Sequence, residues 1–222
     1  MGLDQCKLRI SRILRLDVSE KPLGLILCGG KSSRMLGPNK ALVDFDGQPL
    51  LQRIRSRLEP QVSQLLLNLA EESDEYRPFA LDLCIDLQPD SGPLMGLASA
   101  FSLTNAEQDI ALCPCDAPFI PKDLVVNLAD MMAAENADIV CPSYMGELQP
   151  TFALWNRTTA KRVIAAATEE GIGGLKALYA EFEIATIDWP QPDQGELKPN
   201  PFFNINTPEE LNLALSYLES EE

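Results

Sequence analysis

The chain has 222 residues, a formal charge of −15 and no histidine. Without histidine there can be no histidine-activated serine or cysteine nucleophile, no histidine-ligated zinc or haem, and no histidine general acid–base catalysis. The acidic balance argues against nucleic acid or an anionic membrane as the main partner. Hydrophobic residues make up 45% of the chain, which is enough to form a buried core.

The cysteines and the N-terminal segment bear on the cellular location. The six cysteines form no Cys-x-x-Cys pair, so we expect reduced thiols, with Cys113 and Cys115 as small buried hydrophobes rather than ligands of a soft metal. Residues 1–22 form an N-terminal extension without a signal-peptide stretch, and no apolar run is long enough to span a membrane. We expect a cytoplasmic protein. Basic and apolar residues interleave in residues 1–20, which indicates either a frayed or docked extension or an amphipathic partner-binding arm.

Apolar runs alternate with helical patterns from residue 23 onward. The runs predict strands over 23–28, 64–68, 81–85, 110–113 and 137–141. The patterns between them predict helices over 49–59, 94–104 and 121–135, the last with Pro121 in its first turn. Strands that are apolar on both faces are typical of a mostly parallel sheet covered on each side. We therefore expect an α/β fold with three α/β/α layers of Rossmann-like type.

The pattern changes after residue 142. It predicts strands over 150–155 and 183–187, helices over 157–169 and 173–181, and a proline-rich loop over 189–201. Thr207 to Glu210 match a capping box that opens a last helix reaching about residue 218. We interpret this part as an appended, substrate-facing portion of a single domain over 23–222.

Residues 29–40 point to an anion site. The segment has three positive charges and no negative one, in Lys31, Arg34 and Lys40. The paired glycines at its start let the backbone approach phosphate oxygens closely, which favours a polyphosphate. The residue order matches neither the P-loop nor the dinucleotide-binding pattern. An ordinary strand-to-helix turn is the alternative.

Three ordered motifs carry a more specific resemblance. They are Leu27-x-Gly-Gly-x-Ser-x-Arg-Met-x-Gly-x-x-Lys40, Pro114-Cys-Asp-Ala-Pro118 and Asn204-Ile-Asn-Thr-Pro208. Together they resemble the molybdenum-cofactor guanylyltransferases, a branch of the nucleotidyltransferases with a nucleotide-diphospho-sugar transferase-like fold. Two positions depart from the pattern: Cys28 stands where alanine is usual, and Leu36 where glycine is frequent.

The resemblance implies transfer of GMP from GTP to the terminal phosphate of molybdenum-molybdopterin, with release of pyrophosphate. It also implies Mg²⁺ as cofactor, and molybdoenzyme clients and other cofactor-biosynthesis proteins as partners. The nucleotide-binding part is then about 23–142 and the acceptor-facing part about 143–222. The acceptor phosphate is already an anion and needs no general base, which suits a chain without histidine.

The resemblance also assigns site residues. Arg34, Lys40 and Asp116 are implied as catalytic, with Asp116 as metal ligand helped by Asn206. The implied substrate-binding residues are Leu27, Cys28, Gly29, Gly30, Gly37, Lys40, Asn68, Asp86, Gly92, Gly96, Asp116, Asn204 and Asn206.

Several of these residues have ordinary alternatives. Asp116 follows an apolar strand between two prolines and suits Mg²⁺, but an N-cap for the next helix is the other interpretation. Asp86 can accept from the N1–H and amine of guanine, or form a turn. Gly92 and Gly96 can be turn or packing residues, and Asn206 a turn residue.

Two rival functions remain open at this point. One is a cytidylyl- or sugar-phosphate nucleotidyltransferase of the same fold. The other is a non-catalytic protein that binds a nucleotide or cofactor.

Overall fold

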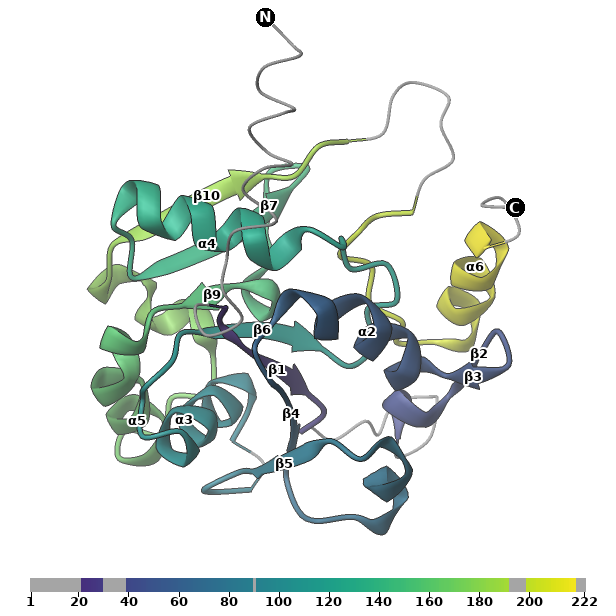
Figure 1. Cartoon of the computed structure of the whole chain (residues 1–222), viewed down its shortest axis with the longest axis horizontal. Coiled ribbons are helices and arrows are strands. Elements are labelled where there is room, and N and C mark those ends of the chain that lie inside the picture. Colours follow the sequence, from purple (N-terminus) through teal and green to yellow (C-terminus); the bar gives the residue numbers. More distant parts are fainter. Residues whose placement is uncertain (1–20, 30–38, 90, 192–198, 219–222) are drawn as a thin grey trace, which may run out of the picture.

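A computed structural model describes residues 21–29, 39–89, 91–191 and 199–218 (Figure 1). Gly30, Arg34, Gly37 and residues 1–20 of the N-terminal extension lie outside the described residues.

Within the described ranges, eight strands form one sheet in the order β10-β7-β9-β6-β1-β4-β5, with β8 paired to β7. Neighbouring strands in this sheet run parallel, with two exceptions: β8 is antiparallel to β7, and β9 is antiparallel to both β6 and β7. The strands are β1 Leu23–Leu27, β4 Leu65–Leu69, β5 Asp82–Ile85, β6 Ile110–Pro114, β7 Ile139–Tyr144, β8 Glu147–Leu148, β9 Leu154–Trp155 and β10 Ile184–Asp188. A separate hairpin joins β2 Asp44–Phe45 to β3 Gln48–Pro49.

Helices cover both faces of the sheet. Two of them, α2 Leu50–Leu58 and α4 Leu124–Glu135, belong to the hydrophobic core of one face. The helices α3 Pro93–Leu103 and α5 Ala160–Thr168 pack side by side on the other face (Figure 1). The last helix, α6 Pro208–Leu218, joins the first core at its margin. This arrangement confirms the three-layer α/β/α fold.

Short 3₁₀ helices connect these elements. They are η2 Lys40–Leu42, η3 Glu59–Gln61, η4 Asp74–Phe79, η5 Pro150–Phe152, η6 Arg157–Thr159 and η7 Leu175–Glu181.

The burial of β1 explains why its sequence is apolar throughout. All five residues of this central strand are buried, because helices cover it on both faces. Gly24 is needed within it because a Cβ there would lie 2.9 Å from a methyl of Leu65 and 3.0 Å from one of Val62. Glycine therefore lets the next strand and its loop pack closely.

Three predicted elements were wrong in type or extent. Only Leu154–Trp155 of the strand expected over 150–155 pairs in the sheet, because the chain turns through η5 at Pro150, which has no N–H to donate. The helix expected from 121 begins at Leu124, after a turn in which Leu124 N–H donates to Pro121 O. The segment expected as a helix over 173–181 is the 3₁₀ helix η7.

The hairpin β2–β3 and the strand β8 were not predicted. Each turn has two residues at positive φ, Asp46-Gly47 and Met145-Gly146. The Asp-Gly pair is a hairpin signal that sequence reasoning could have used.

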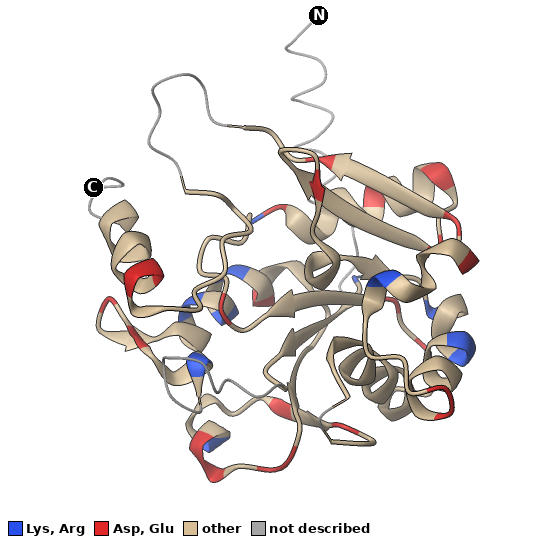
Figure 2. Cartoon of the chain, turned by 180° about the vertical axis from the view of Figure 1, so that it is seen from behind, with Lys and Arg blue, Asp and Glu red and all other residues tan. Residues whose placement is uncertain are grey.

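Five of the six cysteines lie in the described part of the chain. Cys28, Cys84, Cys113, Cys115 and Cys141 are free thiols, with Cys113 buried and Cys115 only partly so. None of the helices in the described part is long and apolar enough to cross a membrane. Asp and Glu residues are spread over helices and loops on several sides of the fold (Figure 2).

Candidate active site

The carboxyl ends of four parallel strands bring the predicted polar residues to one edge of the sheet. Leu27 at the end of β1 lies opposite Asn68 of β4 on one side and Pro114 of β6 on the other. Asn68 in turn lies opposite Cys84 of β5. Residues that follow these strands are therefore neighbours in space, as expected for ligand sites in open α/β sheets.

The first group at this edge surrounds the amide of Asn68. Its Nδ2 donates to Oδ1 of Asp86 at 2.7 Å and to the backbone O of Cys84 at 3.0 Å. A Cβ on Gly29 would lie 3.2 Å from both Asn68 Oδ1 and Asp86 Oδ2. A Cβ on Gly96 would lie 2.4 Å from Asn68 Oδ1. The two glycines thus leave room for a polar pair that is itself fixed in place.

The environment of Asp86 disfavours its charged form. Burial raises the pKa of this carboxyl above its ordinary value, and the hydrogen bond from Asn68 opposes that effect. The 2.7 Å bond to a strand-end amide makes Asp86 part of a built polar pair. Asp86 also donates its backbone N–H to Leu69 O at 2.9 Å, so its backbone continues the ladder between β4 and β5.

The second group joins Lys40, Asp116 and Asn206. Lys40 opens η2, and its Nζ lies 3.3 Å from Oδ2 of Asp116, with the two side chains 20% and 15% exposed. The same Nζ donates to Oδ1 of Asn206. The N–H of Ile205 donates to the backbone O of Asp116 at 2.9 Å, which fixes the segment that carries both asparagines beside β6.

Two side-chain oxygens, one in this second group and one on the neighbouring Asn204, lack a donor among the described residues. Among the described residues, Oδ1 of Asp116 and Oδ1 of Asn204 are buried side-chain atoms without a hydrogen-bond partner. Leaving buried acceptors unsatisfied costs free energy, so such atoms call for a further ligand. The described residues contain no group of three or more Cys, Asp and Glu side chains arranged for a metal ion. A cation bound here would therefore take at most two Cys, Asp or Glu ligands from the described residues.

Two effects act in opposite directions on the pKa of the Asp116 carboxyl. Burial raises its pKa, while the nearby ammonium of Lys40 lowers it. The alternative that Asp116 caps the following helix is wrong, because the N-cap position of α4 is Asp123.

Gly92 occupies a different environment from Gly96. It has φ +81°, and a Cβ on it would lie 2.8 Å from the backbone O of Gly173, which also accepts from Leu94 N–H at 3.2 Å. Gly92 is therefore a turn and close-packing residue at the start of α3. Gly173 was not singled out from the sequence, since nothing local indicates a contact across 81 positions.

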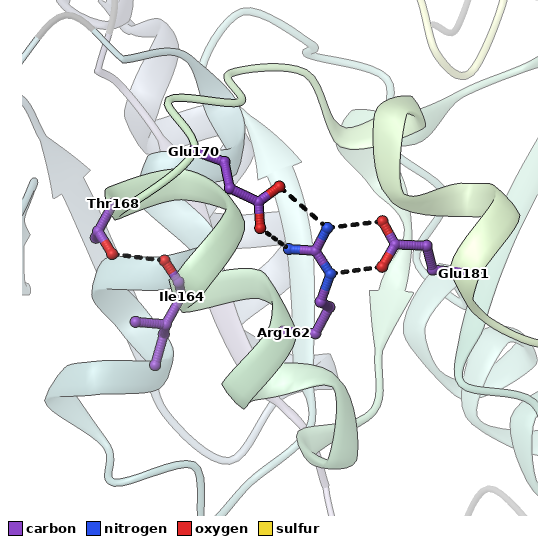
Figure 3. A network of polar contacts seen from close by, with 5 residues as sticks. All are labelled: Arg162, Ile164, Thr168, Glu170 and Glu181. Atoms are coloured by element: carbon purple, nitrogen blue, oxygen red, sulfur yellow. Dashed lines mark hydrogen bonds and ion pairs between the residues drawn. The ribbon is translucent and has the colours of Figure 1, made fainter.

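An ion-pair network frames the segment that contains Gly173. The guanidinium of Arg162 on α5 lies between the carboxylates of Glu170 and Glu181, with Nη1 2.8 Å from Glu170 Oε1 and Nη2 2.8 Å from Glu181 Oε1 (Figure 3). The paired carboxylates raise the pKa of Arg162 further, and Arg162 lowers that of Glu181. Because Glu170 and Glu181 bracket the segment, this network ties it to α5.

Two further predicted residues, Leu27 and Cys28, lie at and directly after the end of β1. Leu27 is buried, and its backbone O accepts from Cys115 N–H at 3.2 Å. The N–H of Cys28 donates to Asn68 O at 3.0 Å, and burial raises the pKa of the Cys28 thiol. Gly30, Arg34 and Gly37 lie outside the described residues.

Sequence reasoning also missed the support for the residue before Lys40. Asn39 donates to Glu75, and the buried Tyr76 donates its hydroxyl to Asn39 Oδ1 at 3.3 Å. Both partners come from η4, in the connection between β4 and β5.

The family model described as "MobA-like NTP transferase domain" matches residues 24–187, which include most of β1, all of β4 and β6, and the site residues Lys40, Asn68, Asp86 and Asp116. The chain belongs to this family. Among curated MobA-like relatives, the molybdenum cofactor guanylyltransferase of Rhizobium meliloti is 35% identical over 90% of this chain and 95% of its own length. The enzyme of the same name from Shewanella amazonensis is 32% identical over 89% and 94%.

A solved structure extends the likeness to the three-dimensional fold. Molybdopterin-guanine dinucleotide biosynthesis protein A from Archaeoglobus fulgidus superimposes with a TM-score of 0.73, covering 89% of this chain and 98% of that one. At 18% identity this similarity concerns the fold alone.

Proposed function

We propose that this MobA-like protein transfers GMP from GTP to the terminal phosphate of molybdenum-molybdopterin and releases pyrophosphate. The single observation that carries the proposal is the cluster of Lys40, Asp116 and Asn206 at the strand ends, together with Asn204 two positions before Asn206. It combines an ammonium with two buried, unpartnered oxygens in a chain of guanylyltransferase-like sequence.

In this reaction an oxygen of the acceptor phosphate bonds to the α-phosphorus of GTP. The bond from that phosphorus to the oxygen bridging the β-phosphate breaks, and pyrophosphate leaves with the electron pair. The nucleophile is already anionic, so no proton has to be removed. The contribution of the protein is positioning and charge stabilisation. Lys40 places its ammonium near the α-phosphate or the leaving pyrophosphate, while Gly29, Gly30 and Arg34 bind the triphosphate.

The orphaned oxygens fit a hard divalent cation, and we propose Mg²⁺. Asp116 and Asn204 would hold it, since Oδ1 of Asn206 already accepts from Lys40. Mg²⁺ is commonly bound through one or two carboxylates together with substrate phosphates and water, so a single Asp suffices. When bound, the ion would neutralise charge on the phosphates.

Asn68 and Asp86 are the proposed base-reading residues. Their fixed geometry presents Oδ2 of Asp86 and the amide Oδ1 of Asn68 beside Gly29, where the N1–H and amine of guanine would find acceptors. Cytosine and adenine lack that pair of donors.

We also propose that the single domain over 23–222 has two functional parts. Residues 23–142 would bind the nucleotide, and residues 143–222 would face the acceptor. Molybdoenzymes and other cofactor-biosynthesis proteins would be partners in the cytoplasm. The acidic surface makes nucleic acid and membranes unsuitable partners.

Pyrophosphate release with each nucleoside triphosphate, in the presence of molybdenum-molybdopterin or a sugar phosphate, tests the function. We expect release only with GTP and the molybdenum-molybdopterin acceptor. A preference for CTP, or turnover with a sugar phosphate, would assign a different transferase. Binding of GTP without turnover on the authentic acceptor would assign a non-catalytic role.

A further inference from the structure

The carboxylate of Glu210 on α6 accepts two backbone N–H groups at the entrance to the helix. Its Oε2 lies 2.6 Å from the N of Asn206 and 3.0 Å from the N of Thr207. In return, Glu210 N–H donates to Thr207 Oγ1 at 3.2 Å, which completes the capping box expected from the sequence. The bond from Asn206 N–H is additional to that motif.

That additional bond connects Glu210 to the active site. It fixes the backbone of Asn206, whose side-chain Oδ1 accepts from Lys40 Nζ. The same ammonium pairs with Asp116 at 3.3 Å. On the other side, Ile205 N–H donates to the backbone O of Asp116. The backbone on both sides of the bond between residues 205 and 206 is therefore anchored, and the Asn206 side chain is oriented toward Lys40.

We propose that Glu210 is a positioning residue, which acts through Asn206 to orient the Lys40 ammonium for the transfer step. The inference rests on the proposed function and on the role of Lys40 within it. Glu210 does not touch Lys40 in any contact of the described residues, and its other link to the site is electrostatic, since burial and the negative charge of Glu210 both raise the pKa of Asp116. Glu210→Gln removes that charge and keeps the acceptor oxygen, so it separates the two effects. The positioning effect should pass through Asn206 and be absent when that side chain is removed.

The principal test is a double-mutant cycle on Asn206 and Glu210, with GTP and molybdenum-molybdopterin as substrates. We expect Glu210→Ala to lower kcat about tenfold or more, as loss of a carboxylate that orients a functional residue typically does. The KM for GTP should change by less than about threefold. In the Asn206→Ala background the same substitution should change kcat by less than about twofold. Glu210→Gln retains an acceptor oxygen and should recover most of the activity.

Two control variants separate positioning from helix capping. Thr207→Ala removes the other half of the capping box and leaves the bond between Glu210 and Asn206 in place. It should lower the melting temperature about as much as Glu210→Ala, with nearly wild-type kcat. Glu209→Gln neutralises an exposed carboxylate in the same helical turn and should change neither quantity.

Several results would overturn the inference. Equal losses of kcat for Thr207→Ala and Glu210→Ala would show that only helix stability matters. Additive losses in the cycle would show that Glu210 does not act through Asn206. Should Glu210→Ala not fold, Glu210→Gln decides, because a folded Gln variant keeps the acceptor oxygen; a kcat about tenfold or more below the wild type in that variant would reject the proposal. If Lys40→Ala and Asn206→Ala both retain full kcat, the proposed roles at the site fail as well.

Discussion

The ammonium nitrogen of Lys40 lies 3.3 Å from Oδ2 of Asp116, although 76 positions separate the two residues in the chain. The ion pair brings the end of the glycine-rich segment to the end of β6. Both side chains retain some exposure, so phosphate oxygens of a substrate can replace Asp116 as partners of the ammonium. The ion pair therefore keeps the Lys40 ammonium, which the reaction needs, next to the proposed metal position.

Replacing Lys40 by alanine should reduce the rate of the chemical step by about a hundredfold to a thousandfold, the usual cost of removing one preorganised charge-stabilising group. Single-turnover measurements with saturating GTP and acceptor isolate that step. Lys122→Ala, which removes an exposed lysine elsewhere, is the matched control. Unchanged single-turnover rates in Lys40→Ala would refute its role in transfer.

Asp116→Asn should fold and lose most turnover, by about a hundredfold or more, because one proposed metal ligand loses its charge. The remaining activity should require a higher Mg²⁺ concentration than the wild type. Activity titrated against Mg²⁺, with circular dichroism to verify folding, measures both effects. Near-normal activity at limiting Mg²⁺ would contradict the metal assignment.

Asp86→Asn should weaken the preference for guanine, because the amide supplies one acceptor and one donor where guanine requires two acceptors. We expect the ratio of GTP to CTP use in a competition assay to fall about tenfold or more. The hydrogen bond from Asn68 can persist, since the new amide oxygen also accepts. An unchanged ratio would remove Asp86 from base recognition.

The same variant predicts a pH effect on stability. Burial raises the pKa of Asp86 in the folded protein above the ordinary value of 3.8, so the folded state binds this proton more tightly than the unfolded chain. The stabilisation is present at low pH and is lost as the pH rises through the raised pKa. Relative to Asp86→Asn, the free energy of unfolding of the wild type should fall as the pH rises above about 4. Urea denaturation at several pH values measures this, and the opposite trend would contradict it.

Gly96→Ala should disrupt the Asn68 amide, because the new Cβ would lie 2.4 Å from its Oδ1 and 2.9 Å from its Cγ. We expect a loss of about 1–3 kcal/mol in the free energy of unfolding, despite the better helix propensity of alanine, and weaker GTP binding. Gly174→Ala is the control, since its Cβ would meet no atom within 4 Å and its φ is −98°. Equal stability and GTP affinity in the two variants would show that Gly96 has no special packing role.

Local sequence patterns were sufficient for the fold class and for most strand-end residues. The apolar run of β1 and the amphipathic pattern of α2 predict their structures because burial on two faces or one face imposes a fixed period on the residues. Such patterns did not give the correct extent of the strand expected over 150–155. Only two of its residues pair, and their antiparallel place between β6 and β7 depends on strands formed elsewhere in the chain.

The amino-acid sequence alone determined the absence of histidine chemistry, the layered α/β architecture, the capping box at Thr207 and the motifs that carry family membership. Each of these depends on residue identity or short spacing. Only the tertiary structure decided that Asp86 bonds to Asn68, that Gly92 packs on Gly173, and that Glu210 reaches Asn206 beside Lys40. The first two depend on which distant segments the folded sheet and its connections bring together. The third depends on how the chain enters α6, and neither kind of arrangement leaves a signal in the local sequence.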